Sequence, residues 1–332
     1  MSQTGLDVVG VGNAIVDVLA KADDAFLSAH DITRGGMMLI DEAQAKEIYA
    51  AMGAAIEISG GSAANTTACV ASFGGAAGFV GKVADDTLGE IFRHDLRALG
   101  VEFETAPLDK GPATGRCLVN VTPDAQRSMS TFLGAAGHVS VADIDPEQIG
   151  RSAITFFEGY LFEGEVPRKA FYKAAEIARS AGRRTALTLS DAGCVERQFA
   201  AFNDFIDQHI DILLANDVEA AALFGSDDLD VIAEKAREKC ALTAVTLSEK
   251  GSLLIPRDGE VVRIDAVNPP QLEDTTGAGD AYAAGLLFGL ARGLDLAQAG
   301  ALGSLAASEI ISHFGARPSV SLKDMAGNAG LI

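Results

Sequence analysis

Residues 274–285, DTTGAGDAYAAG, combine small residues and a carboxylate in a pattern that could hold an anion. Residues 281–292 are almost all small or apolar and close with an arginine followed by glycine, which indicates a helix C-terminus. Gly277, Ala278 and Gly279 then lie at the N-terminus of that helix, where backbone N–H groups lack intrahelical partners. Free N–H groups and the helix dipole together predict an anion hole suited to phosphate.

Asp280 follows these small residues directly. A carboxylate would repel phosphate as a ligand, but it suits a base that removes a proton from a hydroxyl attacking phosphorus. The structural alternative is a helix cap. Two common nucleotide motifs are absent from the sequence: there is no GxxxxGK[ST], and GVGNAI (10–15) has Ile15 where a dinucleotide loop has its third glycine. We therefore expect neither a P-loop enzyme nor a Rossmann dehydrogenase.

The elements that must position this motif alternate along the chain. Strands rich in β-branched residues alternate with amphipathic helices of 10 to 15 residues, a rhythm typical of βαβ units and a doubly wound parallel sheet. The expected strands are 6–12, 76–83, 154–160, 184–190, 211–217 and 243–251. The expected helices are 65–74, 89–100, 167–182 and 230–240.

Two segments break the rhythm, at about 14–59 and 103–133. Their polar and apolar residues alternate between turns, which predicts a small, discontinuous β-layer attached to the α/β body. In open α/β sheets ligands bind beyond the carboxyl ends of the strands. We therefore expect this layer to act as a lid over a crevice at that edge.

Charge and composition narrow the classes of partner. The 332 residues carry 46 acidic and 26 basic side chains, a formal charge of −20, which argues against nucleic acid and anionic membranes. The four cysteines are far apart and predict reduced thiols, and the five scattered histidines give no zinc motif. With neither a leader pattern nor a run of about 18 apolar residues, we expect a soluble, cytoplasmic protein.

Two stretches carry a resemblance to a known family. Residues 274–285 resemble the C-terminal signature of the ribokinase-like (PfkB) carbohydrate kinases, and GGSAANTTACVASFGGAAGFVGKVADDTLGE (60–90) is similar to their N-terminal signature. The resemblance covers nearly the whole chain and implies one ribokinase-like kinase domain, residues 1–332, that uses ATP and Mg²⁺. Within the family, the chain most resembles the adenosine kinases, on residues 12–17, 114–136, 186–199 and 211–225.

The resemblance assigns the catalytic base to Asp280 and the anion hole to Gly277, Ala278 and Gly279. Asn216 and Glu219 match the family's N-x-x-E motif, which holds Mg²⁺ through water. The remaining ATP contacts are expected from Thr246, Ser248, Gly251, His313 and Gly315. Some branches of the family place K⁺ beside the anion hole, where this chain has Asp274, Thr276, Gly315 and Ser319.

The acceptor site is expected from polar residues that suit a cis-diol, namely Asn13, Asp17, Gly60, Gly61 and Asn65. Four apolar residues match positions that would sandwich a flat base: Ile15, Met37, Leu39 and Leu133. Ordinary lid packing is the alternative for these four. Arg127 resembles a lid arginine that reaches the phosphates on closure.

The expected reaction is in-line transfer from MgATP to the 5′-hydroxyl of a nucleoside, adenosine to AMP. Two alternatives stay open. One is a sugar or sugar-acid kinase of the same family, acting on ribose, fructose or 2-keto-3-deoxygluconate. The other is a non-catalytic member that binds a ligand. The resemblance leaves both a monomer and a homodimer open.

Overall fold

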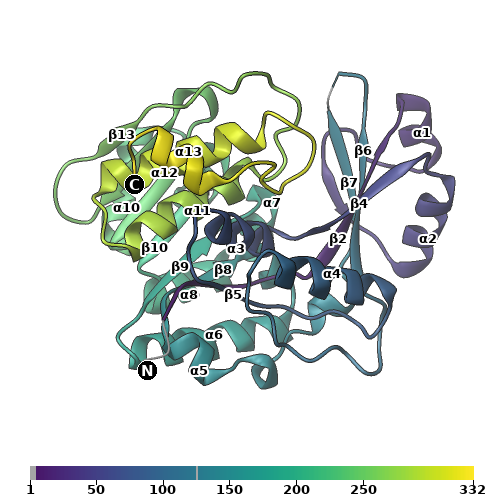
Figure 1. Ribbon diagram of the computed structural model, residues 1–332, viewed down its shortest axis with the longest axis horizontal. Helices are drawn as coiled ribbons and strands as arrows, with labels where there is room; N and C mark the ends of the chain where they lie inside the picture. The colour runs from purple at the N-terminus through teal and green to yellow at the C-terminus, as the bar shows by residue number, and fades with distance from the viewer. Residues whose placement is uncertain (1–4, 125) are drawn as a thin grey trace.

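The computed structural model describes residues 5–124 and 126–332, and two β-sheets organise them (Figure 1). The larger sheet has eight strands. In spatial order they are β13 (Val262–Ile264), β12 (Ser252–Pro256), β11 (Leu242–Thr246), β10 (Ile212–Asn216), β9 (Arg184–Thr188), β8 (Ser152–Glu158), β1 (Leu6–Val11) and β5 (Ala77–Val80). The six strands from β11 to β5 are parallel, so the predicted doubly wound α/β fold is confirmed.

One edge of this sheet corrects the prediction. Residues 243–251 were expected to form one strand, but β11 ends at Thr246 and β12 returns antiparallel to it. The chain reverses through a 3₁₀ turn, η4 (Ser248–Lys250), in which the Leu247 N–H donates to the Gly251 carbonyl at 2.8 Å. Gly251 has φ of +82°, which glycine adopts without strain.

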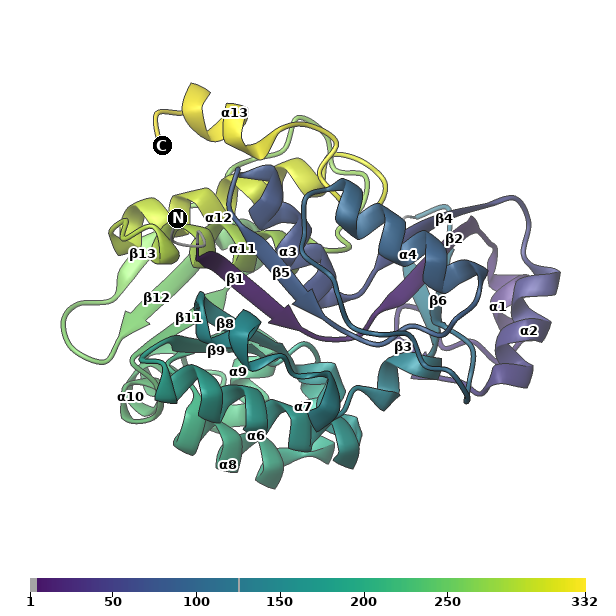
Figure 2. The same ribbon diagram turned by 60° about the horizontal axis from the view of Figure 1, so that its bottom comes forward.

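Helices cover both faces of the larger sheet (Figure 2). One core contains side chains of α3 (Ser62–Ser72), α4 (Thr87–Ala98), α11 (Ala278–Ala291), α12 (Leu296–Ile310) and α13 (Leu322–Asn328). The other contains side chains of α5 (Pro146–Gly150), α6 (Glu165–Ser180), α7 (Ala192–Arg197), α8 (Phe199–His209), α9 (Asp217–Phe224) and α10 (Leu229–Lys239). Val8 and Val9 lie in different cores, because successive strand residues point to opposite faces.

The second sheet stands beside this body, at the right of Figure 1. Its order is β3 (Met37–Leu39), β7 (Arg127–Phe132), β6 (Gly115–Val121), β2 (Ile15–Lys21) and β4 (Ala55–Gly60). Two helices that the sequence interpretation missed, α1 (Asp24–Ala29) and α2 (Glu42–Ala51), pack on one face of it. The other face is a small apolar cluster against which Phe314 of the body packs.

The second sheet starts its C-terminal hairpin only at Gly115. Before that point the chain follows the body, because Phe79 donates its N–H to the Glu102 carbonyl and Leu108 donates to Val83. Thr114 then marks the crossing between the two sheets: its N–H and hydroxyl both donate to the Asp86 carboxylate.

The cysteines and the apolar helices were both subjects of sequence predictions. Its four cysteines are free and buried, as predicted. Within residues 5–124 and 126–332, no helix has both the length and the apolar character needed to cross a membrane.

Candidate active site

A cavity of about 730 Å³ lies where the carboxyl ends of β8 to β11 face the second sheet. Most of the predicted site residues line it. The exceptions are Gly60, Ser248, Gly251, Ala278, His313, Gly315 and Ser319.

The N-terminus of α11 opens into this cavity. Gly277 precedes the helix with φ of +77°, and an added Cβ there would lie 2.5 Å from the Ala316 Cβ, so only glycine fits. An added Cβ on Gly279 would meet no protein atom within 4 Å. The Ala278 N–H donates to the Thr275 carbonyl at 3.3 Å. The Ala278 N–H is therefore not free for an anion, unlike the prediction. Among the described residues, the N–H groups of Gly277, Gly279 and Asp280 have no such acceptor and could bind an anion at this helix start.

Asp280 occupies the first turn of α11, and two side chains of α3 hold its carboxylate. Ser62 Oγ donates to Oδ1 at 2.6 Å, and Asn65 Nδ2 donates to Oδ2 at 2.8 Å. Burial raises the pKa of Asp280, while the bonds from Ser62 and Asn65 oppose that rise. A carboxylate fixed in this way beside an anion hole can accept a proton from a bound hydroxyl. The sequence interpretation missed Ser62, although it follows the Gly-Gly pair of the N-terminal signature.

The turn from β4 into α3 brings backbone unusually close to two polar side chains. An added Cβ on Gly60 would overlap the Asp17 carboxylate, and one on Gly61 would overlap the Asn13 carbonyl. Glycine at both positions therefore lets Asp17 and Asn13 reach the cavity. Burial raises the pKa of Asp17 to about 7, and the Arg317 guanidinium opposes that rise.

A second missed residue, Glu158, supports Asn13. It ends β8, is buried, and accepts bonds from the Asn13 amide side chain at 2.5 Å and from the Ala63 N–H at 2.9 Å. Its burial raises its pKa to about 7. In the part of the chain that the structure describes, Asn13 Oδ1 and Asn65 Oδ1 are buried without a hydrogen-bond partner. Asn13 and Asn65 both line the cavity, and an amide oxygen can accept a hydrogen bond from a hydroxyl of a ligand.

Asn216 and Glu219 form a capping box at the start of α9. The Glu219 N–H donates to Asn216 Oδ1 at 2.8 Å, and Asn216 Nδ2 donates back to Glu219 Oε1 at 2.8 Å. Burial raises the pKa of Glu219 to about 7. No group of three or more His, Cys, Asp or Glu side chains among the described residues could hold a metal directly. One carboxylate and one amide at the cavity wall do fit a hydrated Mg²⁺, which keeps most of its water ligands.

The residues proposed for K⁺ do not form an open site. Asp274 is buried and pairs with Arg127 of β7, and it also accepts the N–H groups of Thr276 at 2.7 Å and Gly315 at 2.9 Å. Ser319 is held elsewhere, by Glu309 of α12 at 2.7 Å. These residues do not converge on a free position for the ion, and we derive no step through K⁺.

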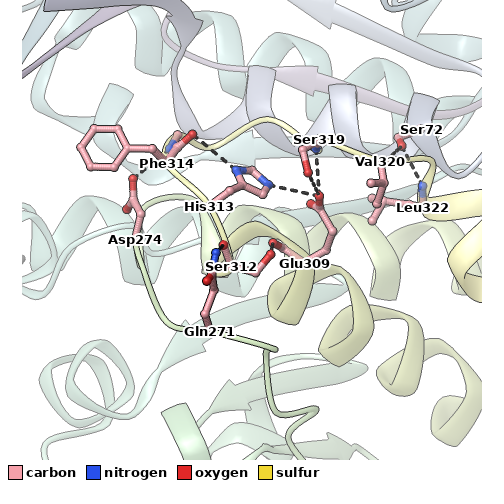
Figure 3. A network of polar contacts seen from close by, with 11 residues as sticks. Ser72, Gln271, Asp274, Glu309, Ser312, His313, Phe314, Ser319, Val320 and Leu322 are labelled. Atoms are coloured by element: carbon pink, nitrogen blue, oxygen red, sulfur yellow. Dashed lines mark hydrogen bonds and ion pairs between the residues drawn. The ribbon is translucent and has the colours of Figure 1, made fainter.

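Figure 3 shows the network beside Asp274 that also contains His313. His313 lies between the Phe314 carbonyl and Glu309, whose Oε1 is 3.1 Å from His313 Nε2. The predicted adenine contacts of His313 and Gly315 stay predictions, as do the ATP contacts of Ser248 and Gly251.

The second sheet contributes an apolar wall to the cavity. Four of its members were predicted, namely Ile15, Met37, Leu39 and Leu133. Two more were missed, Cys117 on β6 and Met129 on β7. This wall lies over the same cavity as Asp17, Asn65 and Asp280.

Comparison with known proteins decides the family. Residues 41–323 match the model of the pfkB family carbohydrate kinases. The chain belongs to this family. It is 47% identical to the adenosine kinase of Sinorhizobium meliloti (TM-score 0.94, 98% and 99% of the two chains covered) and 41% identical to a probable sugar kinase of Rhizobium etli CFN 42 (TM-score 0.95, 99% and 100%). It is 32% identical to fructokinase-1 of rice, Oryza sativa subsp. japonica, over 70% of this chain and 73% of that protein.

This pfkB family kinase is therefore an ATP-dependent phosphotransferase that acts on an alcohol group of a carbohydrate or nucleoside. Its predicted ribokinase-like fold is confirmed by the two solved structures. Relatives named for both kinds of acceptor match the chain, so the comparisons support a carbohydrate or nucleoside acceptor without choosing between the two.

Proposed function

We propose that this kinase phosphorylates the 5′-hydroxyl of a purine nucleoside, with adenosine as the preferred acceptor and AMP as the product. The observation that carries the proposal is the pairing of two unlike walls in one cavity. Polar groups of Asn13, Asp17 and Asn65 suit a ribose, and an apolar wall on the second sheet suits a flat base. A free sugar would leave that apolar wall without a partner.

In the proposed reaction, Asp280 removes the proton of the acceptor hydroxyl as it attacks the γ-phosphorus of ATP. Ser62 and Asn65 orient the carboxylate, and the anion hole stabilises the charge that develops on the phosphoryl oxygens. Asn216 and Glu219 would hold hydrated Mg²⁺, which neutralises charge on the phosphates when bound. No covalent intermediate on the enzyme is needed.

The second sheet is proposed to act as a lid. Arg127 pairs with Asp274 across the cavity, so it connects the sheet to the body near the anion hole. We propose that this guanidinium keeps its pairing with Asp274 and directs its remaining N–H groups to the phosphates when ATP binds. Closure would exclude water, which otherwise competes with the acceptor for the γ-phosphoryl group.

The test is ADP release from MgATP with a panel of acceptors: adenosine, other purine and pyrimidine nucleosides, ribose, fructose and 2-keto-3-deoxygluconate. Adenosine should give the highest kcat/KM, and mass spectrometry should identify AMP. 5′-Deoxyadenosine is the matched control, because it lacks the reacting hydroxyl and should inhibit without turnover. Turnover with a free sugar alone would replace the nucleoside assignment by a sugar kinase. No ATP consumption with any acceptor would favour a ligand-binding role.

A further inference from the structure

Arg317, in the segment after α12, reaches into the turn that joins β4 to α3. Its Nε donates to the Ser59 carbonyl at 3.0 Å, and one terminal nitrogen donates to the Ala64 carbonyl at 2.6 Å. The other terminal nitrogen lies 3.4 Å from Ser59 Oγ. One guanidinium therefore holds the last residues of a lid strand and the first turn of a body helix together.

The clamped turn carries four groups of the site. Gly60 and Gly61 make room for Asp17 and Asn13, and Ser62 and Asn65 orient Asp280. Ser59 and Ala64 flank Gly60, Gly61 and Ser62 in sequence, and Ala64 directly precedes Asn65. A shift of either anchor would therefore move the proposed acceptor site and the orientation of Asp280 together. The planar fork of arginine suits two carbonyls at fixed separation, whereas lysine offers a single nitrogen.

The same side chain supplies positive charge to two acids, Asp17 and Asp280, within a group of buried acidic side chains. Asp280 is surrounded by the acidic groups of Asp17 on β2, Glu158 at the end of β8, Tyr160 and Glu219 on α9. The Arg317 guanidinium lowers the pKa of both Asp17 and Asp280, against the rise that burial causes. Arg127 of β7 adds the same effect at Asp17.

We propose that Arg317 is a positioning residue that fixes the β4–α3 turn against Asp280 and places a positive charge near that carboxylate. The inference rests on the proposed role of Asp280 as the base. Arg317 makes two contributions, the two-pronged shape of its guanidinium and its positive charge. Two substitutions can remove these contributions one at a time.

Arg317→Lys keeps the charge and loses the fork. KM for the acceptor should rise about 10-fold, whereas KM for ATP should change less than about 2-fold. The pH at which activity is lost on the acid side of the profile should not change. Arg317→Gln keeps one donor and loses the charge. Because the ionised carboxylate then loses a favourable cation, the pKa of Asp280 should rise. The acid side of the pH profile should therefore shift to higher pH by about one unit.

Arg292→Gln is the matched control. Arg292 lies at the C-terminus of α11, the helix whose first turn contains Asp280, and it pairs with Asp7. It should leave both KM values and the pH profile unchanged. Hydrogen exchange of residues 59–65 gives a readout independent of activity, and it should be faster in Arg317→Lys than in the wild type.

The proposal would be overturned if both Arg317 variants had the wild-type KM for the acceptor, lost activity at the wild-type pH on the acid side, and showed wild-type hydrogen exchange at residues 59–65. The proposal would also be overturned if kcat fell equally in both variants while KM, the acid side of the pH profile and hydrogen exchange stayed unchanged. That result would indicate only a smaller amount of folded enzyme. If the wild type turns over no acceptor, the proposed function fails, and faster exchange at residues 59–65 would still support the positioning role.

Discussion

The two ends of the cavity are built in different ways. The proposed phosphate end presents backbone N–H groups of Gly277, Gly279 and Asp280, which one helix start holds in place. The proposed acceptor end presents side chains from four strands of a separate sheet, among them Ile15, Met37, Cys117 and Met129. Backbone donors serve any γ-phosphate, whereas side chains on a separate sheet can change without disturbing them. Such a division would allow relatives named for different acceptors to share one fold.

The largest expected effect comes from the phosphate end. Asp280→Asn keeps the shape of the side chain but removes the base, so kcat should fall by about 10²- to 10⁴-fold. ATP affinity should change little. Stopped assays for kcat and calorimetry for ATP binding measure the two quantities separately.

Asp230→Asn is the matched control for that substitution. Asp230 also lies in the first turn of a helix, α10, but it is exposed and away from the cavity. Normal activity of Asp280→Asn would remove Asp280 as the base and leave the helix cap as its role.

At the acceptor end, Asp17→Asn should reduce kcat/KM for adenosine by about 10- to 100-fold, because a charged hydrogen-bond acceptor for the ribose hydroxyls is lost. KM for ATP should stay within about 2-fold. An equal loss with 2′-deoxyadenosine as acceptor would show that Asp17 does not contact the 2′-hydroxyl.

The same variant has a second, opposite effect on stability. The pKa of Asp17 in the folded protein is about 7, above its ordinary value, so the folded state binds more protons than the unfolded state between about pH 4 and 7. The free energy of unfolding contributed by Asp17 therefore falls as pH rises through this window. Asp17→Asn should raise Tm by about 2 °C at pH 8 and leave it unchanged at pH 5. A destabilised variant at pH 8 would show that Asp17 makes a contact that holds the fold.

The sequence could predict the helix that begins after Gly277 because its signals are local. The small residues, the apolar run and the closing arginine of α11 lie in one stretch, and their periodicity is that of a single helix. The parallel direction of the body strands could also be predicted from the sequence, because each strand and the helix after it form one unit. Asp280 and its neighbours needed no knowledge of distant contacts.

The rest depended on tertiary pairing. Cys117 and Met129 reach the cavity only because β6 pairs parallel with β2 and antiparallel with β7 in one register. A shift of one residue would turn both side chains to the other face. Helices α1 and α2 were missed because the polar and apolar residues of 14–59 were interpreted as strand alternation throughout. Ser62 and Glu158 gave a signal, since one follows a glycine pair and the other ends a strand, but only the structure places them against Asp280 and Asn13.

A smaller effect is expected from the apolar wall. Leu133→Ala removes part of the surface proposed to contact the base, so kcat/KM for adenosine should fall about 10-fold. Turnover of ribose, if measurable, should not change. Ile56→Ala is the control, because Ile56 lies on β4 of the second sheet, is 55% exposed and does not line the cavity. Equal losses with adenosine and ribose would assign Leu133 to lid packing.

The smallest expected effect is that of K⁺. Asp274 already has a cationic partner in Arg127 and accepts two backbone N–H groups, so a monovalent ion has little negative charge left to neutralise. Replacing K⁺ by choline at constant ionic strength should change the wild-type kcat by less than about 2-fold. Arg127→Met leaves Asp274 without its cation, and the ratio of rates with and without K⁺ should then rise. A strong K⁺ response in the wild type would mean that Arg127 leaves Asp274 during turnover, which would tie the ion to the phosphate end and separate it from the lid.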